Sequence, residues 1–134
     1  MIKLERYGPL ASRIYHLHRG LKDVINLHAP HRMAVEDVFM AVNPQSALKL
    51  GHARGVILLA AMECGLPLAE FTPLMVKQAV TGYGRAPKGQ VQEMVRVLLS
   101  LRSCPSTDAA DALAVAVCGA NHLAATWLTD KQAL

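Results

Sequence analysis

Short apolar segments alternate with longer amphipathic segments along the chain, and this alternation limits the possible folds most strongly. Three short runs, over residues 1–7, 32–39 and 68–72, have the alternation or composition of strands. Helical spacing of apolar residues predicts helices over residues 9–27, 43–64, 74–80, 90–101 and 108–117. Strands that alternate with helices favour an α/β fold with a mostly parallel sheet.

The composition indicates one helix-rich domain with a core of small and aliphatic side chains. The chain has 134 residues, of which 52% are hydrophobic and only 4% are aromatic. A chain of this length is typical of a single domain with one hydrophobic core. We expect that domain over residues 1–122 and a weakly ordered tail over 123–134, where the hydrophobic pattern fades.

Charge, cysteine content and hydropathy narrow the class of protein. The net charge of +4 permits a polyanionic partner without requiring one. Cys64, Cys104 and Cys118 are odd in number and have no paired spacing, which argues against a disulfide framework and favours the reducing cytoplasm. No apolar run reaches the roughly 18 residues that cross a bilayer, so we expect no membrane partner.

Three carboxylates have positions that suit a metal site. Glu36 ends an apolar strand, and Asp108 and Asp111 are three residues apart at the start of an apolar helix, where they share one face. In a parallel α/β layer the strand ends and helix starts meet at one edge, where ligands bind. Clustered carboxylates suit Mg²⁺ or Mn²⁺, and two such ions can promote phosphodiester cleavage.

A structural explanation competes with this one and is favoured by spacing alone. Asp108 can serve as the N-cap of its helix, and Asp111 as a first-turn acid that interacts with the helix dipole. Glu36 can equally be a solvated strand end.

Basic residues form a second group around a glycine-rich loop over residues 81–89. Lys77, Arg85 and Lys88 belong to this group, and a flexible basic loop with free backbone N–H groups can reach phosphates. The alternative is an ordinary solvated surface loop.

Two further features have both a packing and a binding interpretation. Phe39, which follows Glu36 by three residues, is either a core residue or an aromatic that stacks on a base. Gly51 and Gly55 line one face of a long helix, where they permit close packing within the chain or contact with a second subunit.

Four blocks of sequence, in this order, resemble the bacterial RuvC family of Holliday-junction resolvases. They are Ala34–Met40, Asn43–Gly55, Val76–Gly82 and Asp108–Ala114. The resemblance extends from about Ile2 to about His122, and the four blocks together are far more specific than any one of them.

The resemblance implies a ribonuclease H-like α/β fold, with a mixed sheet flanked by helices in a single nuclease domain. It implies a homodimer that cuts four-way DNA junctions with Mg²⁺ or Mn²⁺, and branch-migration motor proteins become candidate partners. The catalytic and metal-binding carboxylates would be Glu36, Asp108 and Asp111. The DNA-binding residues would be Phe39, Lys77, Arg85 and Lys88.

The sequence departs from the family pattern at its start. The family begins with a strand that carries an Asp-Pro-Gly motif and a further catalytic aspartate, and no such motif occurs here. We therefore expect the first hairpin of the sheet to be missing. Two functions follow as alternatives: a shortened junction endonuclease, or a non-catalytic relative that binds junction DNA and dimerises.

Overall fold

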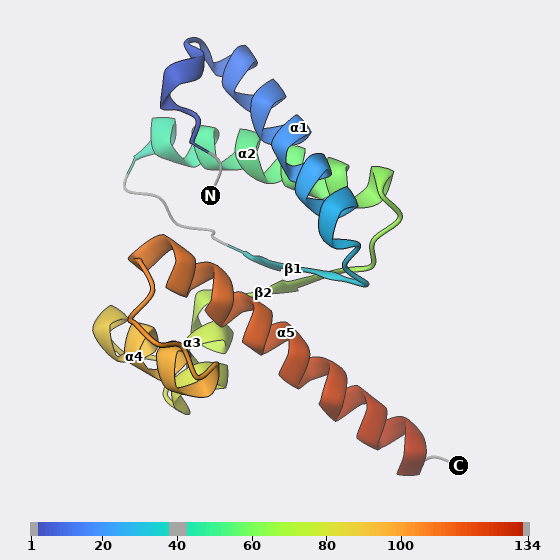
Figure 1. The fold of residues 1–134 in the computed structure, drawn as a ribbon, viewed down its shortest axis with the longest axis vertical. Helices are drawn as coiled ribbons and strands as arrows, with labels where there is room; N and C mark the ends of the chain where they lie inside the picture. Colours follow the sequence, from blue (N-terminus) through green and yellow to red (C-terminus); the bar gives the residue numbers. More distant parts are fainter. Residues whose placement is uncertain (1–2, 38–42, 133–134) are drawn as a thin grey trace. The chain divides into compact units, whose positions relative to one another are not determined.

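The computed structural model describes residues 3–37 and 43–132 of the chain, and it describes side chains as far as residue 123. The chain forms two compact units (Figure 1). The first unit comprises residues 1–33 and 38–68, and the second comprises residues 34–37 and 69–134. The prediction of one domain over 1–122 with a weakly ordered tail remains a prediction.

The first unit consists of the short 3₁₀ helix η1 (Glu5–Tyr7) and two long helices, α1 (Leu10–His28) and α2 (Pro44–Glu63). Its core contains Ile25, Ala61 and Leu66. At the surface, Glu63 Oε2 lies 2.7 Å from His18 Nε2 and 3.2 Å from Lys22 Nζ, which links α2 to α1. The helix starts follow the sequence signals, because Pro9 precedes α1 and the Asn43 side chain accepts a hydrogen bond from Ser46 N–H at 2.9 Å.

The prediction of a strand over residues 1–7 is wrong for the residues that the structure describes. Residues 5–7 form η1, where Tyr7 N–H donates to Leu4 C=O at 3.1 Å. Alternating polarity produces a strand only if a neighbouring strand satisfies its backbone groups, and the sheet among the described residues consists of two other strands. A local hydrogen bond satisfies the backbone instead.

Two short strands pair in parallel. Strand β1 (Met33–Glu36) lies beside β2 (Leu68–Phe71). Met33 N–H donates to Pro67 C=O at 2.9 Å, and Asp37 N–H donates to Phe71 C=O at 2.7 Å. Both bonds have the same sequence offset, so the strands run in the same direction. Both strands were predicted, and β1 ends at Glu36 as far as the described residues extend.

The second unit packs α3 (Pro73–Thr81), α4 (Lys88–Leu98) and α5 (Thr107–Gln132) together. The buried core of this unit includes Phe71, Val80, Val95, Ala114 and Cys118. The backbone of α5 is helical as far as Gln132. Within the part of the chain that the structure describes, no helix has the length and apolar character that a membrane crossing requires.

The predicted boundaries around α4 need correction. The sequence predicts a loop over 81–89 and a helix over 90–101, whereas α4 spans Lys88–Leu98. The helix ends with Ser100 in the left-handed region (φ 51°), and Leu101 N–H donates to Arg96 C=O at 2.9 Å. This bond closes the helix end, so the apolar residues up to Leu101 do not extend it.

Candidate functional site

Glu36 is the last residue of β1 and belongs to the second unit. Its side chain is partly buried, and burial is the largest cause that raises the pKa of its carboxyl above the ordinary value. The negative charge of Asp111 raises this pKa further, and the positive charges of Lys88 and Lys77 lower it in part. These four residues are therefore close enough to interact, and we call Glu36, Asp111, Lys77 and Lys88 the charged cluster.

Two helices bring charges to this strand end. Lys88, in the first turn of α4, places Nζ 3.5 Å from Oδ2 of Asp111 on α5. The Lys88 side chain is 72% exposed and that of Asp111 is 47% exposed. A solvated ion pair of this kind contributes little to stability, so both groups remain available to a ligand.

Helix α5 comes close to β1 through a glycine. A Cβ added at Gly119 would lie 3.0 Å from the Cβ of Ala34 and 3.7 Å from Cε2 of Phe71. Ala34 and Glu36 are two residues apart on a strand and so point to the same side. Glu36 therefore faces the helix that carries Asp111. Sequence reasoning missed Gly119, although the run of small residues from Ala114 to Ala120 indicates a close approach.

Asp108 lies in the first turn of α5, at the surface. It is not the N-cap, because Ala109 N–H donates to the hydroxyl of Ser106 at 3.4 Å and Ala110 N–H donates to the Ser106 carbonyl at 2.8 Å. That alternative for Asp108 is therefore wrong. Asp108 shares a helix face with Asp111, and Asp111 is the aspartate whose charge raises the pKa of Glu36.

A divalent cation fits the donor chemistry of this site. Glu36 and Asp111 offer hard carboxylate oxygens, and their mutual repulsion is the interaction that a cation would relieve. Among residues 3–37 and 43–132, no group of three acidic, histidine or cysteine side chains is assembled to hold a metal. The structure thus brings together two of the three predicted ligands and leaves Asp108 one helical turn away.

The glycine-rich segment is a hydrogen-bonded turn. Tyr83 N–H donates to Thr81 Oγ1 at 3.1 Å, and the Thr81 hydroxyl donates to Lys77 C=O at 2.8 Å. Gly82 adopts a left-handed conformation (φ 75°) that closes α3. Lys77 is partly buried on α3, Arg85 is exposed in the turn, and Lys88 lies on α4 rather than in the loop.

The two remaining sequence predictions have different outcomes. Phe39 lies outside the described residues. Gly51 and Gly55 are exposed on α2, and an added Cβ at either position meets nothing within 4 Å. Packing within the first unit therefore does not require these two glycines, which excludes close internal packing as their explanation among the described residues.

Together, the α/β layer and the acidic strand end facing an acidic helix define a nuclease-like protein of ribonuclease H-like fold. Two solved structures confirm the fold. Thermus thermophilus RuvC has a TM-score of 0.78 and 37% identity, over 89% of this chain and 72% of that chain. RuvC from the same organism in complex with a Holliday junction substrate has a TM-score of 0.82 and 37% identity, over 89% of this chain and 73% of that one.

The chain belongs to the RuvC family of crossover junction endodeoxyribonucleases. Residues 1–119 match the family description "Crossover junction endodeoxyribonuclease RuvC". The RuvC protein of Magnetococcus marinus is 52% identical over 121 residues, covering 90% of this chain and 67% of the relative. That of Syntrophotalea carbinolica is 58% identical over 114 residues, covering 85% of this chain and 71% of the relative. The chain thus spans about two thirds of the length of these relatives, and the predicted family and fold class are confirmed.

Proposed function

We propose that this chain binds four-way DNA junctions and cleaves them with a bound divalent cation, Mg²⁺ or Mn²⁺. The observation that supports this most directly is the charged cluster, in which two carboxylates at the strand end lie beside two lysines. A RuvC structure with a Holliday junction substrate supports the same class of ligand.

In this proposal the acidic side chains hold the cation. Glu36 and Asp111 would bind it, and Asp108 would join them from the preceding turn of α5. When bound, the cation supplies an activated water and stabilises the negative charge that develops on the scissile phosphate. Glu36 must lose its proton to act as a ligand, so its raised pKa makes binding stronger as the pH rises.

The basic side chains would bind the DNA backbone. Lys77 and Lys88 lie close enough to the carboxylates to alter the pKa of Glu36, so a phosphate that they hold lies beside the proposed metal. Arg85 adds an exposed cation in the turn between them. Phe39 remains the proposed aromatic wedge at the junction centre.

A second copy of the chain would bind through α2. The exposed residues Leu48, Gly51, Gly55, Leu59 and Met62 recur every three or four positions and so lie along one face of this helix. Two such faces can approach closely at the glycines. A symmetric dimer of this kind matches the two-fold symmetry of a four-way junction.

The proposal is tested by cleavage and by binding of a labelled four-way junction. We expect Mg²⁺-dependent cleavage that is lost in Asp111→Asn and retained in Arg102→Ala, which removes an exposed cation outside the cluster. Without divalent cations, Lys88→Ala should lower the slope of log affinity against log salt by about one, while Lys88→Arg should preserve it. Salt-dependent binding without Mg²⁺-dependent cleavage would instead identify a non-catalytic junction-binding protein.

A further inference from the structure

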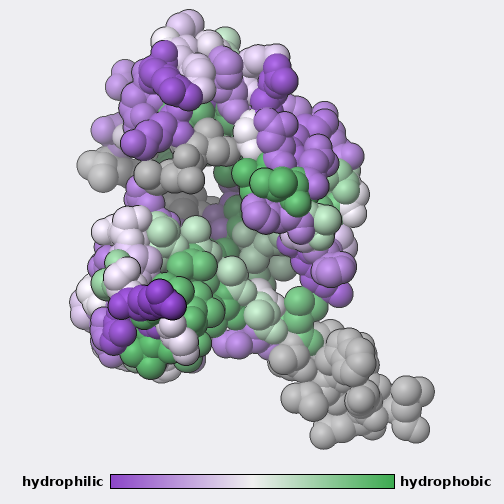
Figure 2. Space-filling model, viewed as in Figure 1, coloured by the Kyte–Doolittle hydropathy of each residue, from purple (hydrophilic) through white to green (hydrophobic). Residues whose placement is uncertain are grey.

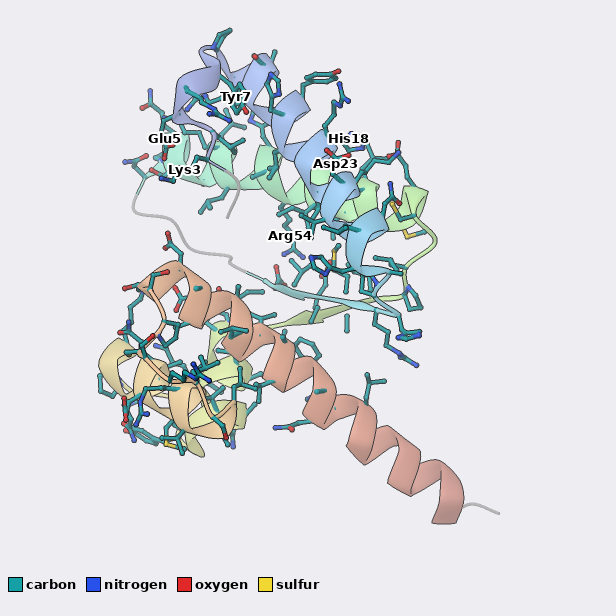
Figure 3. The ribbon with its side chains drawn as sticks, in the orientation of Figure 1. Lys3, Glu5, Tyr7, His18, Asp23 and Arg54 are labelled. Atoms are coloured by element: carbon teal, nitrogen blue, oxygen red, sulfur yellow. The ribbon has the colours of Figure 1, made fainter. Side chains whose placement is uncertain are left out.

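A row of three aromatic rings between two arginines runs over η1 and the first half of α1. The Tyr7 and His16 rings stack with centroids 3.7 Å apart, and Tyr15 meets His16 edge-on at 5.3 Å. Arg6 lies over Tyr7 at 5.0 Å, and Arg19 lies over Tyr15 at 5.9 Å. Figure 3 shows Tyr7 beside the first turns of α1. We call Arg6, Tyr7, His16, Tyr15 and Arg19 the arginine–aromatic row.

The row is accessible and lies in a basic segment. Tyr15 is 54% exposed, and Arg6 and Arg19 are exposed. Each arginine also donates to a phenol oxygen, Arg6 to Tyr7 at 2.8 Å and Arg19 to Tyr15 at 3.3 Å, which orients its remaining N–H groups. The surface over this part of the first unit is mainly hydrophilic in Figure 2.

The balance of charge in this segment favours an anionic partner. Residues 3–23 contain five cations, Lys3, Arg6, Arg13, Arg19 and Lys22, against the two carboxylates Glu5 and Asp23. The hydrogen bond with Tyr15 is the main cause that raises the pKa of the Arg19 guanidinium, and the charge of Asp23 raises it further. The segment thus carries most of the excess positive charge of a chain whose net charge is +4.

The fold makes little use of the row. The residues of α1 that pack against the core of the first unit, Leu21 and Ile25, lie further along the helix. Exposed cation–π contacts contribute little to the stability of a fold. Guanidinium groups suit phosphates, and exposed aromatic rings suit nucleic-acid bases, so the combination is typical of a nucleic-acid surface.

We propose that the arginine–aromatic row is a second DNA-binding surface, separate from the charged cluster, that binds the backbone of a junction beside its unpaired central bases. Arg6 and Arg19 bind phosphates, and Tyr15 holds Arg19 in place and offers its ring face to an unpaired base. This inference rests on the proposed junction binding, and it extends the contact with DNA into the first unit.

The test measures the affinity of the full chain for a labelled four-way junction by fluorescence anisotropy, in EDTA and at several salt concentrations. Each phosphate contact that is lost should lower the log–log salt slope by about one. The Arg6→Gln/Arg19→Gln double variant should therefore have a salt slope lower by about two. Raising the salt from about 50 to 200 mM should then weaken its binding roughly tenfold less than it weakens that of the wild type. Arg32→Gln, an exposed arginine of the same unit outside the row, should leave the slope unchanged.

Two variants of Tyr15 distinguish the contribution of its aromatic ring to binding from that of its hydroxyl. Tyr15→Leu should weaken binding to a junction with unpaired central bases more than Tyr15→Phe does, because only the second keeps a ring. Thermal melting of each variant checks the fold, and Arg19→Gln alone replaces the double variant if the double variant does not fold. Binding of polyglutamate, an acidic polypeptide, is measured in the same variants to test whether the row binds anions in general.

Different results separate this inference from the proposed function. An unchanged slope in the double variant, while Lys88→Ala lowers it, would overturn the second surface and leave junction binding intact. No junction binding by the wild-type chain would overturn both. If substitution of Arg6, Arg19 and Tyr15 weakened polyglutamate binding as much as junction binding, the row would be a general anion-binding surface, and the DNA-specific surface would be rejected.

Discussion

Two effects oppose the ionisation of Glu36, since it lies at a partly buried strand end and Asp111 repels its negative charge. Such a carboxylate is destabilising unless a cation neutralises it. Lys88 and Lys77 supply part of that neutralisation in the protein alone, and a metal or a protonated state would supply more. This arrangement supports the proposed binding of a cation at the site.

Glu36→Gln should raise the stability of the fold at neutral pH. The folded-state pKa of Glu36 lies above its unfolded value, so the folded protein holds this proton to a higher pH and loses stability as the pH rises through that window. The glutamine amide does not ionise, so the variant does not lose this stability. The difference in stability between variant and wild type should vanish below a pH of about 4, where Glu36 is protonated in both the folded and the unfolded state. Urea denaturation at a series of pH values measures it. Saturating Mg²⁺ should reverse the order by stabilising the wild type.

Asp111→Asn should lower the pKa of Glu36, because it removes a negative charge that raises it. Titration of the glutamate carboxyl carbons by NMR follows this change directly. Asp108→Asn is the matched comparison, since Asp108 lies one turn earlier on the same helix, and we expect it to change the Glu36 titration less. If the two variants changed the Glu36 titration equally, the proposed pairing of Glu36 with Asp111 would be wrong.

At the scale of secondary-structure elements, the crossing of α5 over β1 sets the separation of the two carboxylates. Gly119 permits this crossing, because a Cβ there would lie only 3.0 Å from that of Ala34. Cys118 and Ala114, buried on the same helix, fix its rotation in the core of the second unit. The geometry of the site therefore depends on the contact between Gly119 and Ala34, neither of which has a polar or charged side chain.

Gly119→Val should separate α5 from β1 and disturb the site. Overpacking of this kind costs about 1–3 kcal/mol, and the Glu36 titration should shift toward the ordinary value as Asp111 moves away. Thermal melting and NMR titration measure the two effects. Gly89→Ala on α4 is the control, because its Cβ would meet nothing within 4 Å and alanine favours a helix. A Glu36 titration that stays as raised as in the wild type, in a folded Gly119→Val protein, would exclude this positioning role.

At the scale of the whole molecule, the first unit exposes an apolar face along α2. Leu48 is 63% exposed and Met62 is 69% exposed, while the buried residues Ala60 and Ala61 point elsewhere. Large side chains exposed in a row on one helix face are typical of a protein–protein contact. The proposed dimer would cover this face.

Gly55→Leu should convert a dimer into a monomer without harming the fold. The added side chain meets no atom within 4 Å of its Cβ in the single chain, whereas it would separate two helices that cross at this point. Sedimentation equilibrium measures the association constant, which should fall at least tenfold. Lys49→Leu adds the same side chain at an exposed position of α2 outside this face and should leave the association unchanged. An unaltered Gly55→Leu dimer would place the interface on another surface.

Much of this protein could be predicted from local signals in the sequence. Apolar spacing and the residues Pro9, Asn43 and Pro73 mark helix starts, because each acts through backbone groups within one turn of itself. The placement of Glu36 at a strand end followed from the same kind of pattern. Local signals failed over residues 1–7, where pairing with another strand would have been required, and at Lys88, where Gly89 resembles a loop residue yet lies inside α4.

The sequence by itself determined the family and the candidate residues, because four ordered blocks of chemistry-bearing residues leave few alternatives. Only the tertiary structure decided which of them meet. Asp108 and Asp111 share one face of α5, and the packing of α5 against β1 at Gly119 and Ala34 brings the charge of Asp111 close enough to act on Glu36. The arginine–aromatic row likewise could not be predicted from the sequence, because it forms only when η1 packs against α1 and Tyr7 stacks on His16. The spacing of residues in the sequence shows which side chains share a face of one helix or strand. A site needs side chains from two such elements, and the packing between the elements determines the distance between those side chains.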